Sequence, residues 1–404
     1  MKNKPIEGQV TLLDFDLERE LEKVTSQITG IDYDNQDDEN EESRGEEKPF
    51  DADKIRIDQQ MLSVKYICEL MESDMIDTNP NFQRKGVWKD QKKKSLLIES
   101  LMLRIPIPAF YFFEDEDSTY QVIDGQQRIR TINDFIGGKF KLTGLEYLNA
   151  TCGGRFFEEL DKKYQQRIYR TQLAVNILDV RSPKNVIYDI FRRVNTGGMP
   201  LTLQEMRNAI CKPKVREFLC KMATNEAYLI ATRKKIKDER MDSQEMVLRF
   251  YAFWSIYKDN KLEYTYKNVA SMLDDAIEKL NKCSQNELDE IYNVFNRSMI
   301  KCEELFGKYA FSKLQYDENT NKVKRPMDLI NKSLFSSFSV LLSDEKYADI
   351  DLRPYQEKAI KIFGKKLVDS DYFNSITMGT GDKKRIDTNF RYSMEVLEEC
   401  QIGK

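Results

Sequence analysis

The sequence YQVIDGQQRIRTI, residues 120–132, combines the signals of a strand, a tight turn and a helix. Its first four residues are mostly β-formers in a short apolar run. The pair Asp124-Gly125 marks a turn. Apolar residues then recur at helical spacing until Gly137-Gly138, which is a helix stop. The stretch therefore predicts a strand that passes through a glycine directly into a helix.

This predicted corner has the chemistry of an anion site. Backbone N–H groups and the positive end of the helix dipole meet where a helix begins, and phosphates bind there. Gly125 allows close approach, Gln126 and Gln127 add amide donors, and Arg128 adds a planar fork that grips phosphate bidentately. Asp124 can hold Mg²⁺ or orient a water. An ordinary turn with a solvated arginine is the alternative, but five polar or glycine residues at one strand end favour the phosphate site.

The chain contains no histidine among its 404 residues. A Ser-His-Asp triad, a Cys-His pair and histidine-containing zinc sites are therefore excluded. An HNH nuclease centre also needs histidine. Acid–base chemistry in this chain must use carboxylates, lysine, tyrosine or metal-bound water. The seven cysteines show no C-x-x-C spacing, so we expect reduced and mostly buried thiols.

Charge is distributed unevenly along the sequence. Residues 32–53 contain eleven acidic and two basic residues, a net of −9, so the rest of the chain carries +5 of the total of −4. We expect this acidic run to be a disordered linker. A net charge of +5 on the rest of the chain is compatible with nucleic-acid binding but does not require it. No apolar run reaches membrane-spanning length and no signal-peptide core follows Met1, so we expect a cytoplasmic protein.

The pattern of elements predicts an α+β fold in three parts. Residues 1–53 would comprise the acidic linker and, before it, an amphipathic segment at 11–29. That segment suits a docking or homo-oligomerisation helix, or a plain surface helix. Residues 54–200 would form a small mixed sheet with helices, and residues 201–404 an all-helical domain.

Within the middle part, the expected elements follow one another closely. Strands are expected at 55–57, 109–114, 120–123 and 172–178, and a short strand pair at 139–148. Helices are expected at 64–71, 89–104, 126–136, 158–168 and 185–194. Ser63 is the expected cap of the first helix, and Thr202 with Glu205 forms a capping box for the next domain.

Two further segments contain candidate ligand residues. The polar segment NPNFQRKGVW, residues 79–88, is anchored by apolar side chains that would fix Gln83 and Arg84. Asn195 lies beside a Gly-Gly pair at 197–198, which suits either a helix–helix turn or a loop that closes over a ligand. An ordinary packed loop is the alternative at 79–88.

The order of five sequence blocks resembles the N-terminal domain of GmrSD-type restriction systems, the DGQQR family. The blocks are NPNFQR followed by Trp88, LIES at 97–100 with Leu101, IPIP at 105–108, DGQQR at 124–128 and FRRVNTGG at 191–198. The family's domain is similar to the fold of ParB-type partition proteins and sulfiredoxins. The resemblance therefore implies a ParB/sulfiredoxin-like sheet and antiviral defence against phage DNA.

The resemblance also implies the use of a nucleotide. It implies binding and hydrolysis of a nucleoside triphosphate (GTP, ATP or CTP) with Mg²⁺ at the DGQQR motif. The expected catalytic residues are Asp124, Gln127 and Arg128, with Asp124 as the metal ligand. Fused family members often carry an HNH nuclease half, which the missing histidines exclude from this sequence.

These observations leave one leading hypothesis and two alternatives. The leading hypothesis is a Mg²⁺-dependent NTPase subunit of a DNA-targeting defence system, whose nuclease is a separate subunit. The first alternative is a non-catalytic DNA-binding protein that a nucleotide switches. The second is a histidine-independent DNA nickase, which the sequence disfavours because no paired-carboxylate-plus-lysine motif has the required spacing.

Overall fold

The protein divides into two compact units, which we call the sheet unit, Glu47–Ile210, and the helical unit, Met1–Glu46 with Cys211–Lys404. The structure, a computed structural model, describes residues 29–32, 56–77, 90–115, 118–179, 181–182, 187, 190, 193, 202–238, 240–258, 268–317, 319–320, 322–324, 328–377 and 381–403. All but the last residue of the segment at 11–29, most of the acidic run, and the candidate residues Gln83, Arg84 and Asn195 lie outside these ranges.

The sheet unit is built on a five-stranded mixed sheet in the order β1-β5-β3-β4-β2. The central hairpin pairs β3 with β4 in antiparallel register, and β5 lies parallel to β3 on its other side. The edge strands are β1, antiparallel to β5, and β2, parallel to β4. The strands are β1 (Ile57–Ser63), β2 (Ile76–Asp77), β3 (Phe110–Glu114), β4 (Tyr120–Asp124) and β5 (Gln172–Asp179).

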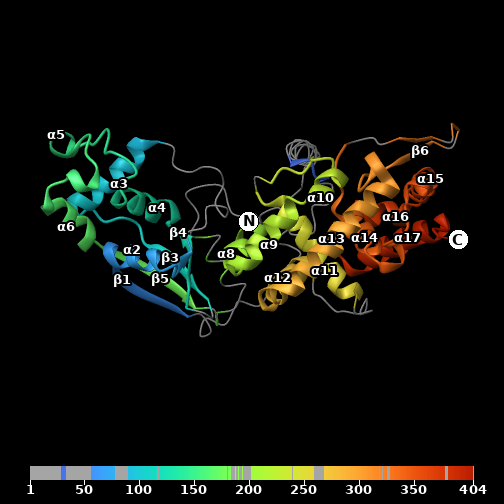
Figure 1. Ribbon diagram of the computed structural model, residues 1–404, viewed down its shortest axis with the longest axis horizontal. Helices are drawn as coiled ribbons and strands as arrows, with labels where there is room; N and C mark the ends of the chain where they lie inside the picture. The colour runs from blue at the N-terminus through green and yellow to red at the C-terminus, as the bar shows by residue number, and fades with distance from the viewer. Residues whose placement is uncertain are drawn as a thin grey trace, which may run out of the picture. The chain divides into compact units, whose positions relative to one another are not determined.

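Helices cover one face of this sheet and form a core with it. Phe110 and Phe112 of β3, Val122 of β4 and Val175 of β5 project to the same side, because alternate residues of a strand share a face. They pack against apolar residues of the helices, which Figure 1 shows gathered beside the sheet. The helices of this unit are α2 (Val64–Glu72), α3 (Gln91–Leu103), α4 (Gln126–Ile136), α5 (Asn149–Cys152), α6 (Lys162–Arg170) and α8 (Leu203–Ile210).

Local signals in the sequence located most of these elements correctly. Ser63 caps α2 and its side chain accepts a hydrogen bond from the Tyr66 N–H. The capping box is also confirmed, because the Thr202 N–H donates to Glu205 and the Glu205 N–H donates to Thr202 Oγ1. Helix α4 ends at Gly137 as expected.

Three predictions for the sheet unit were wrong. The strand expected at 55–57 shares only Ile57 with β1, which continues to Ser63. No strand pair forms at 139–148, which is an irregular loop. The helix expected at 158–168 is split into a 3₁₀ turn, Phe157–Glu159, and α6, which begins three residues later. The extended conformation of Leu160 separates the two, and its N–H closes the turn on Phe157.

The 139–148 loop is held by one face of α3 instead of by strand pairing. Gln91, Ser95 and Glu99 follow one another at four-residue intervals and therefore share a helical face. Gln91 donates to the Lys141 carbonyl at 2.9 Å, and Ser95 accepts from the Thr143 N–H at 2.9 Å. The buried carboxylate of Glu99 accepts from three successive N–H groups, residues 146–148, at 2.8–3.0 Å. Four of the loop's backbone donors are thus satisfied by side chains of α3 without a sheet.

The helical unit packs its helices around α14, whose residues are all buried. Asn331 caps this helix and its amide also donates to Asp32 and to the Ile376 carbonyl. The order of the surrounding elements can be followed in Figure 1. The helices are α9 (Pro213–Ala223), α10 (Glu226–Ala231), α11 (Asp242–Lys258), α12 (Val269–Lys282), α13 (Gln285–Phe306), α14 (Lys332–Leu341), α15 (Gln356–Lys366), α16 (Ser370–Ser375) and α17 (Lys383–Cys400), with short 3₁₀ turns at Gly307–Tyr309, Glu345–Tyr347 and Arg353–Tyr355.

One part of the helical unit departs from the all-helical expectation. A small hairpin, β6 (Gln315–Asp317) with β7 (Lys322–Lys324), stands between α13 and α14. Asp317 begins its turn by accepting N–H groups of Asn319 and Thr320, as aspartate does in tight turns. The α+β class itself is confirmed, with a mixed sheet followed by a mostly helical region.

Two sequence expectations about cysteines and membranes are also answered. All seven cysteines are free thiols, and five of them are buried. Burial raises the pKa of Cys68 and of Cys400 to about 11, so both remain protonated at neutral pH. Among the described residues, no helix combines the length and the apolar character that crossing a membrane requires.

Replacing Glu99 tests whether its carboxylate holds the loop. We expect Glu99→Gln to lower the free energy of unfolding by about 2 kcal/mol, because the amide leaves one oxygen to accept the three N–H groups and brings two donors of its own. Urea denaturation of the purified chain measures this. Ser100→Ala on the same helix is the control, since its hydroxyl donates only to the Leu96 carbonyl, and it should change stability by less than about 0.5 kcal/mol. Equal stability of the two variants would contradict the assignment.

Candidate functional site

The predicted corner forms as a strand-to-helix turn at Gly125. Strand β4 ends at Asp124 and α4 begins at Gln126, with Gly125 as the N-cap at φ +96°. This left-handed conformation favours glycine. The Gly125 carbonyl accepts the first helical hydrogen bond, from the Ile129 N–H at 2.9 Å. The N–H groups of the first turn of α4 therefore lie next to the end of β4. In any α-helix, the N–H groups at this end have no acceptor within the helix itself.

The glycine is also required by its neighbour on β3. A Cβ atom placed on Gly125 would lie 2.2 Å from Cδ1 of Phe110. No real Cβ contact is that short, so the phenyl ring occupies the space that a side chain would need. The sequence analysis assigned the missing side chain to phosphate approach. In the structure its first role is to let Phe110 pack against the turn.

Arg128 is fixed at this corner by four neighbours. Its Nη2 donates to Asp124 Oδ2 at 2.8 Å and to the Ala109 carbonyl at 3.1 Å, and its Nη1 donates to the Pro108 carbonyl. Its guanidinium carbon lies 4.3 Å from the centre of the Phe110 ring, a cation–π distance. Only 13% of the side chain is exposed. Burial lowers the pKa of Arg128 and the Asp124 carboxylate raises it, and the group remains charged.

The fork of Arg128 retains donors after these contacts. A guanidinium has five N–H groups, and three of them point at Asp124 and the two carbonyls. Within the described part of the chain, no hydrogen bond accounts for the remaining two, one on Nη1 and one on Nε. Arg128 is therefore both a structural clamp between β3, β4 and α4 and a source of two further donors.

Asp124 is engaged on one side only. Its Oδ2 pairs with Arg128, while 31% of the side chain remains exposed. No described residue donates to its Oδ1. One carboxylate oxygen is thus available to a water or a cation, in the field of an adjacent guanidinium that disfavours an isolated metal ion.

The structure brings five of the eight predicted site residues to one turn. Asp124, Gly125 and Arg128 meet as described, while Gln126 is buried and Gln127 half-buried on the first turn of α4. Gln83, Arg84 and Asn195 lie outside the described residues. In the part of the chain that the structure describes, no group of three or more acidic, cysteine or histidine side chains could hold a metal.

Sequence reasoning missed the neighbours that fix Arg128. The carbonyls of Pro108 and Ala109 come from the segment before β3, and the ring of Phe110 comes from its first residue, about twenty residues earlier in the chain than Arg128. The IPIP block at 105–108 was visible as a helix stop, but a proline run does not reveal which side chain its carbonyls will meet. A long-range contact of this kind has no local sequence signal.

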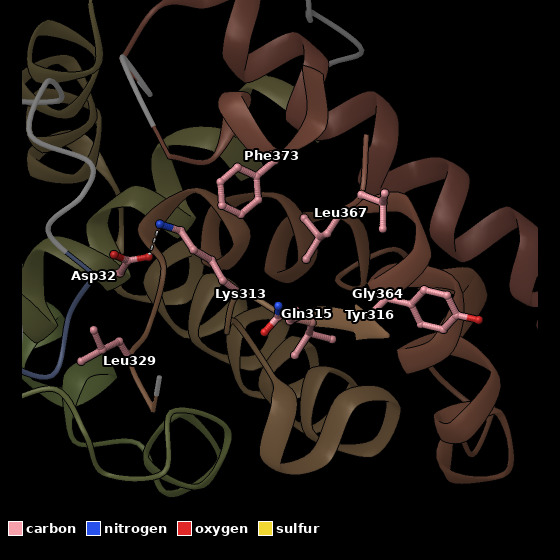
Figure 2. Close-up of a pocket in the computed structure, with 10 residues that line it drawn as sticks. Asp32, Lys313, Gln315, Tyr316, Leu329, Gly364, Leu367 and Phe373 are labelled. Carbon is pink, nitrogen blue, oxygen red and sulfur yellow. Dashed lines mark ion pairs between the residues drawn. The ribbon is translucent and has the colours of Figure 1, made fainter. Parts of the chain in front are cut away.

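The helical unit contains a hollow of about 370 Å³, which Figure 2 shows. Lys313 pairs with Asp32 at 2.8 Å at one end, and its Nζ lies 6.0 Å from the centre of the Phe373 ring. Asp32, the first acid of the run at 32–53, is therefore buried inside the helical unit. Apolar side chains such as Leu329 and Leu367 line the rest.

Comparison with known families supports the reading of the sheet unit. Residues 67–212 match the family model described as the GmrSD restriction endonuclease, N-terminal domain, which confirms the resemblance inferred from the five blocks. The match begins within α2 and includes the whole corner at 124–128. A search of curated proteins finds no match.

Gly125→Ala tests the packing of the corner. We expect it to lower the free energy of unfolding by about 2–4 kcal/mol, because the methyl group meets Phe110 and the left-handed φ strains alanine. Thermal denaturation followed by circular dichroism measures the loss.

The control is Gly138→Ala, also at positive φ (+69°) but with open space around its Cβ. It should cost only the strain of the backbone, about 1 kcal/mol. The added variant Phe110→Leu should restore part of the Gly125→Ala loss. Equal losses at the two glycines, or no rescue, would show that Phe110 does not impose the glycine.

Proposed function

We propose that this chain, whose residues 67–212 form a GmrSD-type restriction endonuclease N-terminal domain, is the nucleotide-dependent subunit of a DNA-targeting restriction or defence system. In the proposal, a nucleoside triphosphate binds with its phosphates at the Asp124–Arg128 corner. Binding and hydrolysis there control the action on DNA, which a separate nuclease subunit performs.

The observation that supports nucleotide binding best is the clamped position of Arg128. Asp124 and two backbone carbonyls hold its guanidinium at the start of α4 and leave two N–H donors. A fork held in advance loses little conformational entropy when it binds phosphate. The helix N-terminus adds backbone N–H groups and a favourable dipole at the same place. Gln127, half-buried on the first turn, is the proposed additional donor.

The donor set fits a Mg²⁺ ion that arrives with a nucleotide. Mg²⁺ commonly takes one or two carboxylates and completes its shell with phosphate oxygens and water. Asp124 offers one oxygen, and phosphate charge would offset the repulsion from Arg128. When bound, the ion would neutralise charge on the phosphates. Asp124 then has two proposed roles, holding that ion or orienting the water that attacks the terminal phosphate.

One observation favours binding without turnover as a second candidate. The Asp124 Oδ2 already accepts a hydrogen bond from Arg128 at 2.8 Å, so only the other oxygen of this carboxylate could take a proton from an attacking water. A nucleotide that only switches the protein between two conformations needs binding but no attacking water. Release of inorganic phosphate in the presence of Mg²⁺ separates the two candidates, because the switch predicts none.

Isothermal titration with ATP, GTP and CTP, each with Mg²⁺, tests the phosphate site. We expect one of them to bind the wild type and Arg128→Lys to weaken that binding by roughly tenfold, because lysine keeps the charge but loses the fork. Arg155→Lys is the control, an exposed arginine of the same unit that pairs with Asp161. It should bind as the wild type does. If none of the three binds, or if Arg128→Lys binds unchanged, the proposed site is wrong.

A further inference from the structure

The sheet unit contains a hollow of about 660 Å³ that is lined by four basic residues. They are Arg104, Lys163, Arg167 and Arg170, and we call this feature the basic groove. No acidic side chain is among its lining residues. The groove is formed by residues other than those of the Asp124–Arg128 corner, and neither the sequence motifs nor the family match assigns it a role.

Helix α6 supplies most of the charge from one face. Lys163, Gln166, Arg167 and Arg170 lie at spacings of three, four and seven residues, which places them on one stripe of the helix. The buried residues of α6 are Tyr164 and Ile168, and the Tyr164 ring lies 4.8 Å from Lys163 Nζ and 5.6 Å from the Arg167 guanidinium carbon, at the border of this stripe. The amphipathic pattern of α6 therefore orients its cations into the groove. Seven residues of helix make this stripe about 10 Å long.

The fourth cation comes from a different element. Arg104 is the C-cap of α3 and has the left-handed φ of +61°. This conformation ends the helix, and the chain continues through Ile105 and Pro106 along the same groove. Two separate elements thus contribute like charges to one hollow, an arrangement that repels itself unless an anion is present.

These cations are weakly compensated within the described part of the chain. Arg104 and Arg170 form no ion pair there, and Lys163 reaches Asp161 only at 3.7 Å on an exposed surface. Arg167 donates to the Met102 carbonyl at 3.2 Å, which positions it without neutralising its charge. The groove therefore presents three arginine forks and one lysine to solvent or to a ligand.

A purely structural explanation covers part of this pattern. Arg167 and Arg170 lie in the last turn of α6, where cations interact favourably with the helix dipole. The helix dipole also favours Arg104, at the C-terminal end of α3, but it does not explain Lys163, which lies in the first turn of α6. It also does not explain why apolar side chains beside these charges stay exposed, Met61 by 60% and Ile105 by 47%.

We propose that the basic groove binds the sugar–phosphate backbone of DNA. Arginine forks match phosphate oxygens bidentately, and three of the four cations are arginines. Gln166 and Gln172 add neutral donors, and Met61 and Ile105 offer apolar contacts to the sugars. The inference shares with the proposed function only the DNA partner, because it does not involve the nucleotide corner.

The test measures how salt weakens binding of a 20-base-pair duplex, by fluorescence anisotropy without nucleotide. The variant is Arg104→Gln/Arg170→Gln, which removes two exposed charges. Each lost phosphate contact lowers the slope of log affinity against log salt by about 0.9. We expect the magnitude of this slope to be smaller by about 1.8 in the variant. Between 50 and 200 mM salt, the factor by which the variant loses affinity should therefore be about one twelfth of the wild-type factor.

The control is Lys65→Gln/Arg155→Gln, which removes two exposed positive charges elsewhere in the same unit. It should keep the wild-type slope. Equal slopes for the two double variants would overturn the proposal, as would wild-type binding of polyglutamate without binding of the duplex, which would indicate an acidic protein partner. Thermal denaturation confirms that both variants are folded. Nucleotide titration of the same variants keeps a failure here distinct from a failure at the corner.

Discussion

The ion pair between Arg128 and Asp124 is the contact on which the architecture of the corner depends. A guanidinium that is largely withdrawn from water needs partners for its charge and its donors. Asp124 at the end of β4 supplies the charge, and the carbonyls of Pro108 and Ala109 supply the acceptors. Because the contact ties the approach to β3, the end of β4 and the first turn of α4 together, it fixes where the helix N-terminus points.

The same contact explains the composition of the motif. Phe110 lies under the guanidinium and against Gly125, so a ring, a glycine and an arginine occupy one closely packed site. Two donors of Arg128 and one oxygen of Asp124 remain for chemistry after the structural contacts are made. The ligand proposed for the corner meets the protein with its terminal phosphates, whereas the ligand proposed for the basic groove is a long, uniformly charged polymer.

The sequence predicted those parts of the fold whose causes are local. Each of these local features depends on contacts between residues no more than four positions apart, and each was located correctly: the Ser63 cap, the Asp124-Gly125 turn and the Thr202–Glu205 capping box. The loop at 139–148 was misread because its N–H groups bond to Glu99, almost fifty residues away.

For the candidate site, the sequence predicted that five residues lie at one strand-to-helix turn, where the structure has them, but it did not predict their neighbours. The carbonyl partners of Arg128 depend on how the chain before β3 crosses α4, which no short pattern encodes. The sequence analysis did not single out the cations of α6, and the basic groove also depends on Arg104, which only the fold brings alongside them. Long-range backbone contacts account for the difference in both cases.

Hydrogen–deuterium exchange with mass spectrometry tests the central claim most directly, because it reports where a nucleotide acts. The peptide of interest covers residues 120–132, compared with and without a slowly hydrolysed triphosphate analogue and Mg²⁺. A phosphate bound at the start of α4 should slow the exchange of this peptide, because a bound ligand opposes local opening of the helix N-terminus. Protection confined to other peptides, under conditions where calorimetry reports binding, would contradict the claim that this corner holds the phosphates.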